Sequence, residues 1–199
     1  MQTSWAGLLG LLCSSAAQSP AGSRRILVFA MQLRNLFALG LFFVTACAAQ
    51  LSPRMTTSVT IDGKKITVAY GAPSMRGRKV MGSLVPYGEV WCAGANDATS
   101  LETEADLDIN GMKVPKGSYT LWTLPNQNQW LLIVNKQTGQ WHTDYRERFD
   151  LGRVKMNIRS IAPTVERMKF DLSATGGNKG TLALSWETTE VSVPITVLR

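Results

Sequence analysis

The residues of this sequence whose types favour ligand chemistry gather between Tyr70 and Thr99. Arginine guanidinium groups present planar forks of donors that suit carboxylates and other anions, while tryptophan and tyrosine rings offer stacking surfaces. Five glycines in this stretch permit the sharp turns that a long ordered loop needs. We therefore predict a ligand-binding loop here. Its candidate binding residues are Arg76, Arg78, Tyr87, Glu89, Trp91, Asn96 and Thr99.

The same loop also has a purely structural interpretation, in which it is a crossover that covers one end of a β-sandwich. Its arginines would then bond to backbone carbonyls, because loops need internal polar partners. Arg78 and Asn96 together can orient one polar ligand. If they are structural, removing either leaves donors or acceptors unpaired, at about 1–3 kcal/mol. We favour the structural role for this pair and predict that Arg78→Ala and Asn96→Ala each lower the thermal midpoint.

Nucleophilic catalysis would have to use Cys92 with His142, which are fifty residues apart in the sequence. No local signature surrounds the cysteine, so we expect a buried, inert thiol. His142 is the only histidine, which excludes zinc sites built from several imidazoles. The glycines lack the Gly-Lys-Ser/Thr ending of a phosphate loop. The sequence predicts no metal and no cofactor.

Carboxylates offer the remaining catalytic chemistry. A glycosidase-like pair can be drawn from Glu89, Glu102, Asp144 and Glu187, but sequence spacing does not fix the separation that such a pair needs, and none is preferred. The alternating acids at positions 102, 104, 106 and 108 are expected on one strand face. A solvated surface is the favoured interpretation there, and a calcium site is the alternative.

The formal charge of +7 does not indicate a nucleic-acid partner. Three basic residues precede Cys47, while all fourteen acidic residues follow it. The small excess of basic residues that remains is spread over the whole domain, and its longest cluster is Arg76, Arg78 and Lys79. That pattern is typical of a soluble surface rather than a phosphate-binding face, so we expect no nucleic-acid binding.

The first 49 residues have the features of a targeting segment. An apolar run at 36–46 follows Arg34 and ends at Cys47, which is the order of a signal peptide. The run is too short for a comfortable membrane span, which needs about 20 apolar residues. Residues before Met31 fit this order badly. We therefore expect translation to begin at Met31, a signal peptide at 31–49 and a single β domain at 50–199.

Two ways of processing this signal stay open. Val44-Thr45-Ala46-Cys47 resembles a lipoprotein signal, which would place a lipid on Cys47, while Ala46-Cys47-Ala48 also fits ordinary signal peptidase. We slightly favour the lipoprotein. The protein is therefore expected to be exported and to be periplasmic, attached to the outer membrane or extracellular, with its oligomeric state open.

Short alternating stretches separated by turn dipeptides predict an all-β domain. Asp62-Gly63 and Asn110-Gly111 each stand between β-branched runs and predict type I′ hairpins. Only 75–81 and 143–149 are compatible with a turn or two of helix. Eight or nine short antiparallel strands favour a β-sandwich or a barrel-like sandwich. The candidate stretches for these strands are 57–61, 64–70, 107–109, 112–114, 117–124, 129–135, 154–158, 167–172, 181–187 and 191–198.

Several ordered motifs resemble those of the domain of unknown function 2911 family. They are YGAPSMRGRKVMGSLVPYGEVWCAGANDAT at 70–99, PKGSYTLWTLP at 115–125, WLLIVNK at 130–136, Gln140-Trp141 and LSWETTEVSVPI at 184–195. The resemblance covers residues 54–197 and implies an exported bacterial β-sandwich-type domain with no established activity. Two positions depart from the family pattern: Cys92 stands where it usually has an arginine, and His142 where a glycine is more familiar.

We expect a non-enzymatic envelope or secreted domain that binds a small molecule, a glycan or an envelope protein through the loop at 70–99. A carboxylate-based hydrolase and a purely structural module are the alternatives. Trp91 and Trp141 lie near loops and are the candidates for an exposed stacking platform. The other tryptophans of the domain, Trp122, Trp130 and Trp186, lie in alternating strands and are expected in the core.

Overall fold

Residues 51–199, the part of the chain that the computed structural model describes, fold almost entirely as antiparallel β-strands. They form one compact unit, Leu51–Arg199. The expected signal peptide, the start at Met31 and the lipid site at Cys47 lie outside the described residues. Within those residues, no helix is long and apolar enough to cross a membrane. The elements are β1 (Arg54–Ile61), β2 (Lys64–Gly71), β3 (Ser100–Thr103), β4 (Leu107–Ile109), β5 (Met112–Val114), β6 (Gly117–Leu124), β7 (Trp130–Asn135), the 3-10 helix η2 (Glu147–Phe149), β8 (Asp150–Gly176) and β9 (Lys179–Val197).

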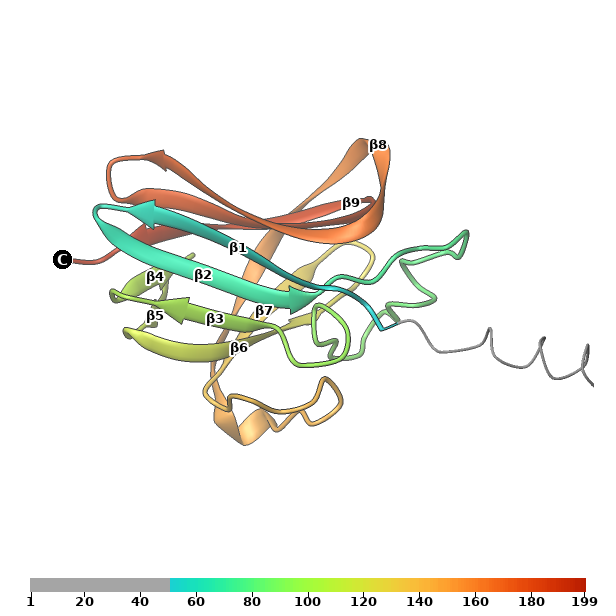
Figure 1. Ribbon diagram of the computed structural model, residues 1–199, viewed down its shortest axis with the longest axis horizontal. Helices are drawn as coiled ribbons and strands as arrows, with labels where there is room; N and C mark the ends of the chain where they lie inside the picture. Colours follow the sequence, from blue (N-terminus) through green and yellow to red (C-terminus); the bar gives the residue numbers. More distant parts are fainter. Residues whose placement is uncertain (1–50) are drawn as a thin grey trace, which may run out of the picture. The chain divides into compact units, whose positions relative to one another are not determined.

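Hydrogen bonds join the strands in the order β1-β2-β3-β6-β7-β8-β9-β4-β5, and every neighbouring pair is antiparallel. The 27-residue strand β8 turns the sheet back on itself, because residues 150–156 pair with β7 and residues 157–176 pair with β9. Figure 1 shows β8 and β9 arching over β1 and β2. The predicted antiparallel all-β fold is confirmed, with nine strands in one hydrogen-bonded series across the described residues.

Turn chemistry explains both short hairpins. Asp62 and Gly63 have φ of 52° and 73°, and Asn110 and Gly111 have φ of 49° and 93°. Positive φ at both central residues is the geometry of a type I′ turn, whose twist matches that of the flanking strands. These turns set the register of β1 with β2 and of β4 with β5, as the dipeptides predict.

The core lies on two sides of the sheet. The larger cluster takes the inward residues of the strands, such as Ile66, Val68 and Leu101, and the expected core residues Trp130 and Trp186. A smaller buried cluster, on the other face of β6 and β7, contains Cys92, Ala98, Trp122 and Ile133. Because successive strand residues face opposite ways, Trp122 and Ile133 point away from their buried neighbours Leu121 and Leu132 on β6 and β7.

Residues 72–99, here called the crossover, connect β2 to β3 without forming a named strand or helix. The helical turn considered at 75–81 is absent and is replaced by tight turns, whereas the stretch at 143–149 does contain η2. Ala72 N–H donates to Pro53 O at 2.8 Å, and Met75 N–H donates to Glu166 O at 2.9 Å. In Figure 1 the crossover extends from the end of β2 beside the start of β1.

Candidate functional site

The crossover, the loop after β7 and the middle of β9 together line a cleft of about 300 Å³. Two predicted binding residues, Arg78 and Trp91, lie in its wall. Cys92 and His142 join them there. Among residues 51–199, the lining is Pro73, Arg78, Leu84, Trp91, Cys92, Gly94, Ala95, His142 and Trp186. Residues far apart in the sequence thus meet in one concave surface.

A pair of stacked indoles forms the apolar side of the cleft. The ring centroids of Trp91 and Trp186 are 6.0 Å apart with an interplanar angle of 21°. Trp91 also meets Trp130 edge-on, with a centroid distance of 6.4 Å and an angle of 87°. Trp186 is buried and its Nε1–H donates to Glu166 O at 3.2 Å, which fixes the ring from behind. The indoles are therefore held rigidly by packing and by one hydrogen bond.

Arg78 supplies the charge of the cleft and is oriented by the turn that precedes it. Its Nε–H donates to Met75 O at 2.9 Å, and Nη2 donates to Ser74 O at 3.0 Å. No ion pair within residues 51–199 involves Arg78. Arg78 is exposed, and because a guanidinium has five N–H donors, the two carbonyls leave three donors available.

Strained backbone surrounds the cleft. Ala93, Asn96 and Glu187 have φ of 50°, 65° and 55°, in the left-handed region that costs a residue with a Cβ roughly 1–2 kcal/mol. Each lies beside a lining residue, since Ala93 is flanked by Cys92 and Gly94, and Glu187 follows Trp186. Strain of this kind persists only where the surroundings impose it, and it concentrates at binding and catalytic sites.

Hydrogen bonds to the carboxylate of Glu187 offset the backbone strain at this residue. It accepts hydrogen bonds from the backbone N–H groups of Val80 at 3.5 Å and Met81 at 3.0 Å. These contacts join β9 to the crossover immediately after Arg78 and Lys79. The carboxylate is therefore occupied in holding the cleft together.

Cys92 is a neutral thiol in the wall of the cleft. Its side chain is buried, and Sγ–H donates to Gly94 O at 3.1 Å. Burial raises the pKa of this thiol to about 11. The buried thiol that the sequence predicts is confirmed, and because the thiolate is the nucleophile, the raised pKa disfavours a nucleophilic role.

The family model of the protein of unknown function DUF2911 matches residues 52–195. The chain belongs to this family. Neither the curated proteins nor the solved structures contain a significant match to the chain. The DUF2911 match includes the crossover, the loop that carries His142 and the part of β9 that carries Trp186, so every residue that lines the cleft belongs to the family domain.

In this DUF2911 domain, three of the other predicted binding residues form hydrogen bonds within the domain, two of them to backbone carbonyls and one to the carboxylate of Glu166. Asn96 Nδ2–H donates to Ser52 O at 2.9 Å, and the fully buried Thr99 donates from Oγ1 to Ala93 O at 3.0 Å. The backbone N–H of Arg76 donates to Glu166 Oε1 at 2.9 Å. Asn96 and Thr99 thus support the crossover from within, and Arg78 bonds to two backbone carbonyls of the crossover, as the structural interpretation expects.

Tyr87 and Glu89 also lie outside the lining of the cleft. Both are exposed, and the ring of Tyr87 lies over Gly82, where a Cβ would come within 2.9 Å of it. Of Arg78, Glu89 and Asn96, whose convergence in one pocket would favour a binding or catalytic loop, the structure places only Arg78 in the cleft.

The candidate catalytic carboxylates are dispersed. Glu102 is exposed on β3, Asp144 pairs with Arg146 at 3.0 Å, and Glu187 is bonded to the crossover. The expectation that the acids at 102, 104, 106 and 108 share one strand face is wrong, because β3 ends at Thr103 and β4 begins at Leu107. No group of three or more metal-ligating side chains occurs among residues 51–199.

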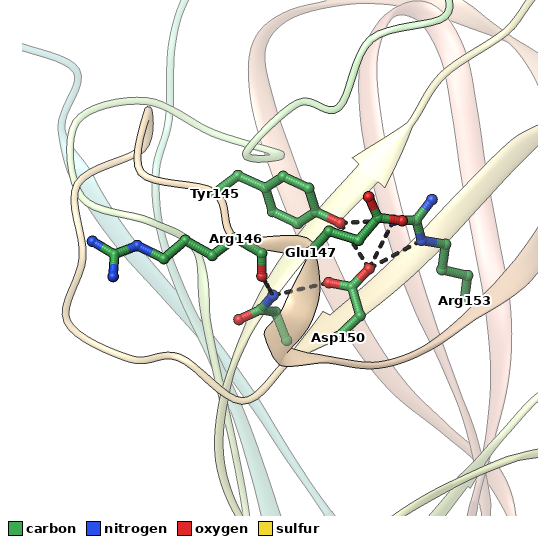
Figure 2. A network of polar contacts seen from close by, with 6 residues as sticks. Tyr145, Arg146, Glu147, Asp150 and Arg153 are labelled. Atoms are coloured by element: carbon green, nitrogen blue, oxygen red, sulfur yellow. Dashed lines mark hydrogen bonds and ion pairs between the residues drawn. The ribbon is translucent and has the colours of Figure 1, made fainter.

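Sequence reasoning missed a polar network at the start of β8, which Figure 2 shows. Tyr145 Oη–H donates to Asp150 Oδ2 at 2.7 Å, and Arg153 donates to the same oxygen from Nε at 3.0 Å and Nη2 at 2.9 Å. Arg153 also pairs with Glu147 at 2.7 Å. The buried Asn135 donates from Nδ2 to Asp150 Oδ1 at 2.9 Å. In the sequence, these residues have the pattern of an ordinary charged surface, so nothing in it predicts that they form a network.

This network holds the loop that brings His142 to the cleft. The Tyr145 ring packs on Trp122 at a centroid distance of 5.1 Å, and burial together with the hydrogen bond to Asp150 raises the pKa of the phenol. Asp150 is engaged by three side chains, so the network is satisfied internally. The Tyr145 ring joins the network to the smaller core cluster, which contains Trp122 and the cleft residue Cys92.

Proposed function

We propose that this DUF2911 protein is an exported, non-enzymatic binding domain that takes a small molecule in the cleft between the crossover and β9. The observation that carries this proposal is Arg78, which is fixed by two carbonyls beside the stacked indoles of Trp91 and Trp186. A small number of placed polar groups in a mostly apolar hollow is the usual composition of a ligand site.

The chemistry of the lining favours binding over catalysis. Its nine residues include no carboxylate, and its thiol is protonated at neutral pH. His142 lines the cleft without a carboxylate to orient it, because its backbone N–H, at 3.0 Å from Asn96 O, is its only hydrogen bond within residues 51–199. General acid–base and nucleophilic mechanisms both require a partner for the reacting group. The carboxylate hydrolase therefore has no support from this cleft.

The export half of the proposal rests on the sequence before the domain. The apolar run at 36–46 and Cys47 precede Leu51 by a few residues. The chain then enters the domain beside the cleft, because Asn96 holds Ser52 O and Ala72 N–H holds Pro53 O. A lipid on Cys47 would tether the protein at the end of the domain that carries the cleft.

Fractionation of cells that express the tagged protein tests the tether. We expect the full chain in the membrane fraction and the Cys47→Ser variant in the soluble exported fraction. Cys92→Ala, which removes the other cysteine of a chain that begins at Met31, is the matched control and is expected to fractionate like the unaltered chain. A Cys47→Ser protein that remains in the membrane fraction would exclude the lipid anchor.

A fragment screen followed by two-dimensional ¹H–¹⁵N NMR tests the binding site. We expect the fragments that bind to shift the indole Nε1–H signals of Trp91 and Trp186. The Nε1–H of Trp122 donates to Thr120 Oγ1 at 3.1 Å in the other core cluster and serves as the internal control. Binding that shifts Trp122 and leaves both cleft indoles unchanged would contradict the proposal.

A further inference from the structure

We propose that the ligand of the cleft is a small organic anion with a flat apolar body, whose anionic group meets Arg78 while its ring lies against the wall formed by Trp91 and Trp186. This inference rests on the proposed function and specifies the class of ligand. The anionic group is a carboxylate or an equivalent oxyanion, because these match the donor geometry of a guanidinium.

The charge of the lining supports an anion. Among the described residues that line it, Arg78 is the only permanently charged one, and none is an aspartate or a glutamate. Glu187 directly follows the lining residue Trp186, but its carboxylate accepts hydrogen bonds from the backbone N–H groups of Val80 and Met81. The Cys92 thiol adds no negative charge at neutral pH. A positive charge without a local counter-ion attracts an anion and rejects a cation.

The fixed orientation of the Arg78 side chain also supports a specific contact with an anion. Bonds from Nε to Met75 O and from Nη2 to Ser74 O fix the plane of the guanidinium before a ligand arrives. An anion then meets donors that need little further ordering, which lowers the entropic cost of binding. Lys79, the next residue, is also a cation, but it does not line the cleft and forms no ion pair within residues 51–199.

The size and composition of the cleft favour a compact ring. A volume of about 300 Å³ is at the lower end for ligand pockets. Pro73, Leu84 and the partly exposed Trp91 present carbon surface, and the buried Trp186 backs the Trp91 ring at an interplanar angle of 21°. Flat ligands gain most from contact with such surfaces, because stacking requires a planar partner.

Two ligands that differ only in charge test this inference: 2-naphthoate and its neutral analogue 2-naphthamide. Each is titrated into the protein at neutral pH, and the Trp91 and Trp186 Nε1–H signals report binding. We expect 2-naphthoate to bind at least tenfold more tightly than 2-naphthamide. Equal affinities, with both compounds shifting the two indoles, would overturn the anion preference while leaving the cleft as a binding site. Failure of both compounds to shift either indole would count against this ligand class and, if the fragment screen also misses the cleft, against the proposed function.

A pair of neighbouring variants makes the test specific for the guanidinium. Arg78→Gln is expected to remove the preference for 2-naphthoate while retaining binding of 2-naphthamide, which also shows that the cleft is intact. Arg78→Lys is expected to keep part of the preference, because the charge remains and the fork is lost. Lys79→Gln removes one positive charge from the adjacent position and is expected to leave the preference unchanged. An equal loss in Arg78→Gln and Lys79→Gln would show that general surface charge, and not Arg78, selects the anion.

Discussion

The indole of Trp91 stacks on the indole of Trp186, with ring centroids 6.0 Å apart, although one belongs to the crossover and the other to β9. This contact joins the loop that carries the cleft to the largest part of the core. Trp186 is almost fully buried, whereas Trp91 is partly exposed and faces the cleft. The ligand wall is therefore one side of a packed core, and its stability and its binding geometry depend on the same residues.

Replacing Trp186 by alanine is expected to lower the free energy of unfolding by about 3–5 kcal/mol, because it removes a buried indole and leaves a cavity. Trp141 is 49% exposed and provides the matched control. Trp141→Ala is expected to change stability by no more than about 0.5 kcal/mol. Urea denaturation measures both values. Similar losses in the two variants would mean that Trp186 does not anchor the crossover.

Asn96 combines a positive φ of 65° with a hydrogen bond from its amide to Ser52 O. Asn96→Ala loses the bond and keeps the strain, so we expect a loss of about 1–3 kcal/mol, measured as a lower thermal midpoint. Asn96→Gly also loses the bond but adopts the same φ without strain, and it is expected to cost less. An alanine variant as stable as the glycine variant would show that the backbone conformation has changed.

Cys92 links stability to alkaline pH. Its pKa is raised by burial from 9.0 to about 11, so between these values the unfolded chain releases the proton while the folded protein retains it. The unfolded state then binds fewer protons, and stability falls as the pH rises from about 9 to 11. Cys92→Ala is expected to reduce the slope of that fall relative to the unaltered protein. Parallel stability curves for the two proteins would contradict a buried, protonated thiol.

Asp150 is expected to control the loop that carries His142. Its side chain is only 11% exposed and accepts bonds from Tyr145, Asn135 and Arg153. Asp150→Asn loses the ionic contact to Arg153, and we expect it to lower the free energy of unfolding by about 1–3 kcal/mol and to broaden the NMR signals of His142. Asp171 is exposed on β8 and has no ion pair within residues 51–199, so Asp171→Asn is the control. Sharp His142 signals in Asp150→Asn would mean that the network does not position the loop.

Local signals in the sequence predict much of this fold. Asp62-Gly63 and Asn110-Gly111 specify their turns through residues that tolerate positive φ, and alternation places Trp122, Trp130 and Trp186 in the core. The strand at Ser100–Thr103 was missed, because four residues with a central glutamate carry little β pattern. β8 and β9 were each predicted as two shorter strands, since bulges near Ser160 and Val165 interrupt their alternation.

The cleft was only partly predictable. Arg78 and Trp91 lie in a stretch whose composition indicates a functional loop, and both line the cleft. Trp186 was assigned to the core, which is correct, but no pattern indicates that it also stacks on Trp91. Contacts between distant segments depend on how β8 returns over β1 and β2, and that return is not encoded in any one stretch. The Tyr145–Asp150–Arg153 network was not predictable either, because no single stretch of sequence specifies these contacts.

A crystal structure of the protein soaked with 2-naphthoate tests the central claim most directly. The account predicts the naphthalene ring in the cleft against Trp186 and Trp91, with the carboxylate about 2.7–2.9 Å from the free donors of Arg78. Density for 2-naphthoate elsewhere on the domain, with the cleft empty and Arg78 bonded only to Met75 and Ser74, would contradict it.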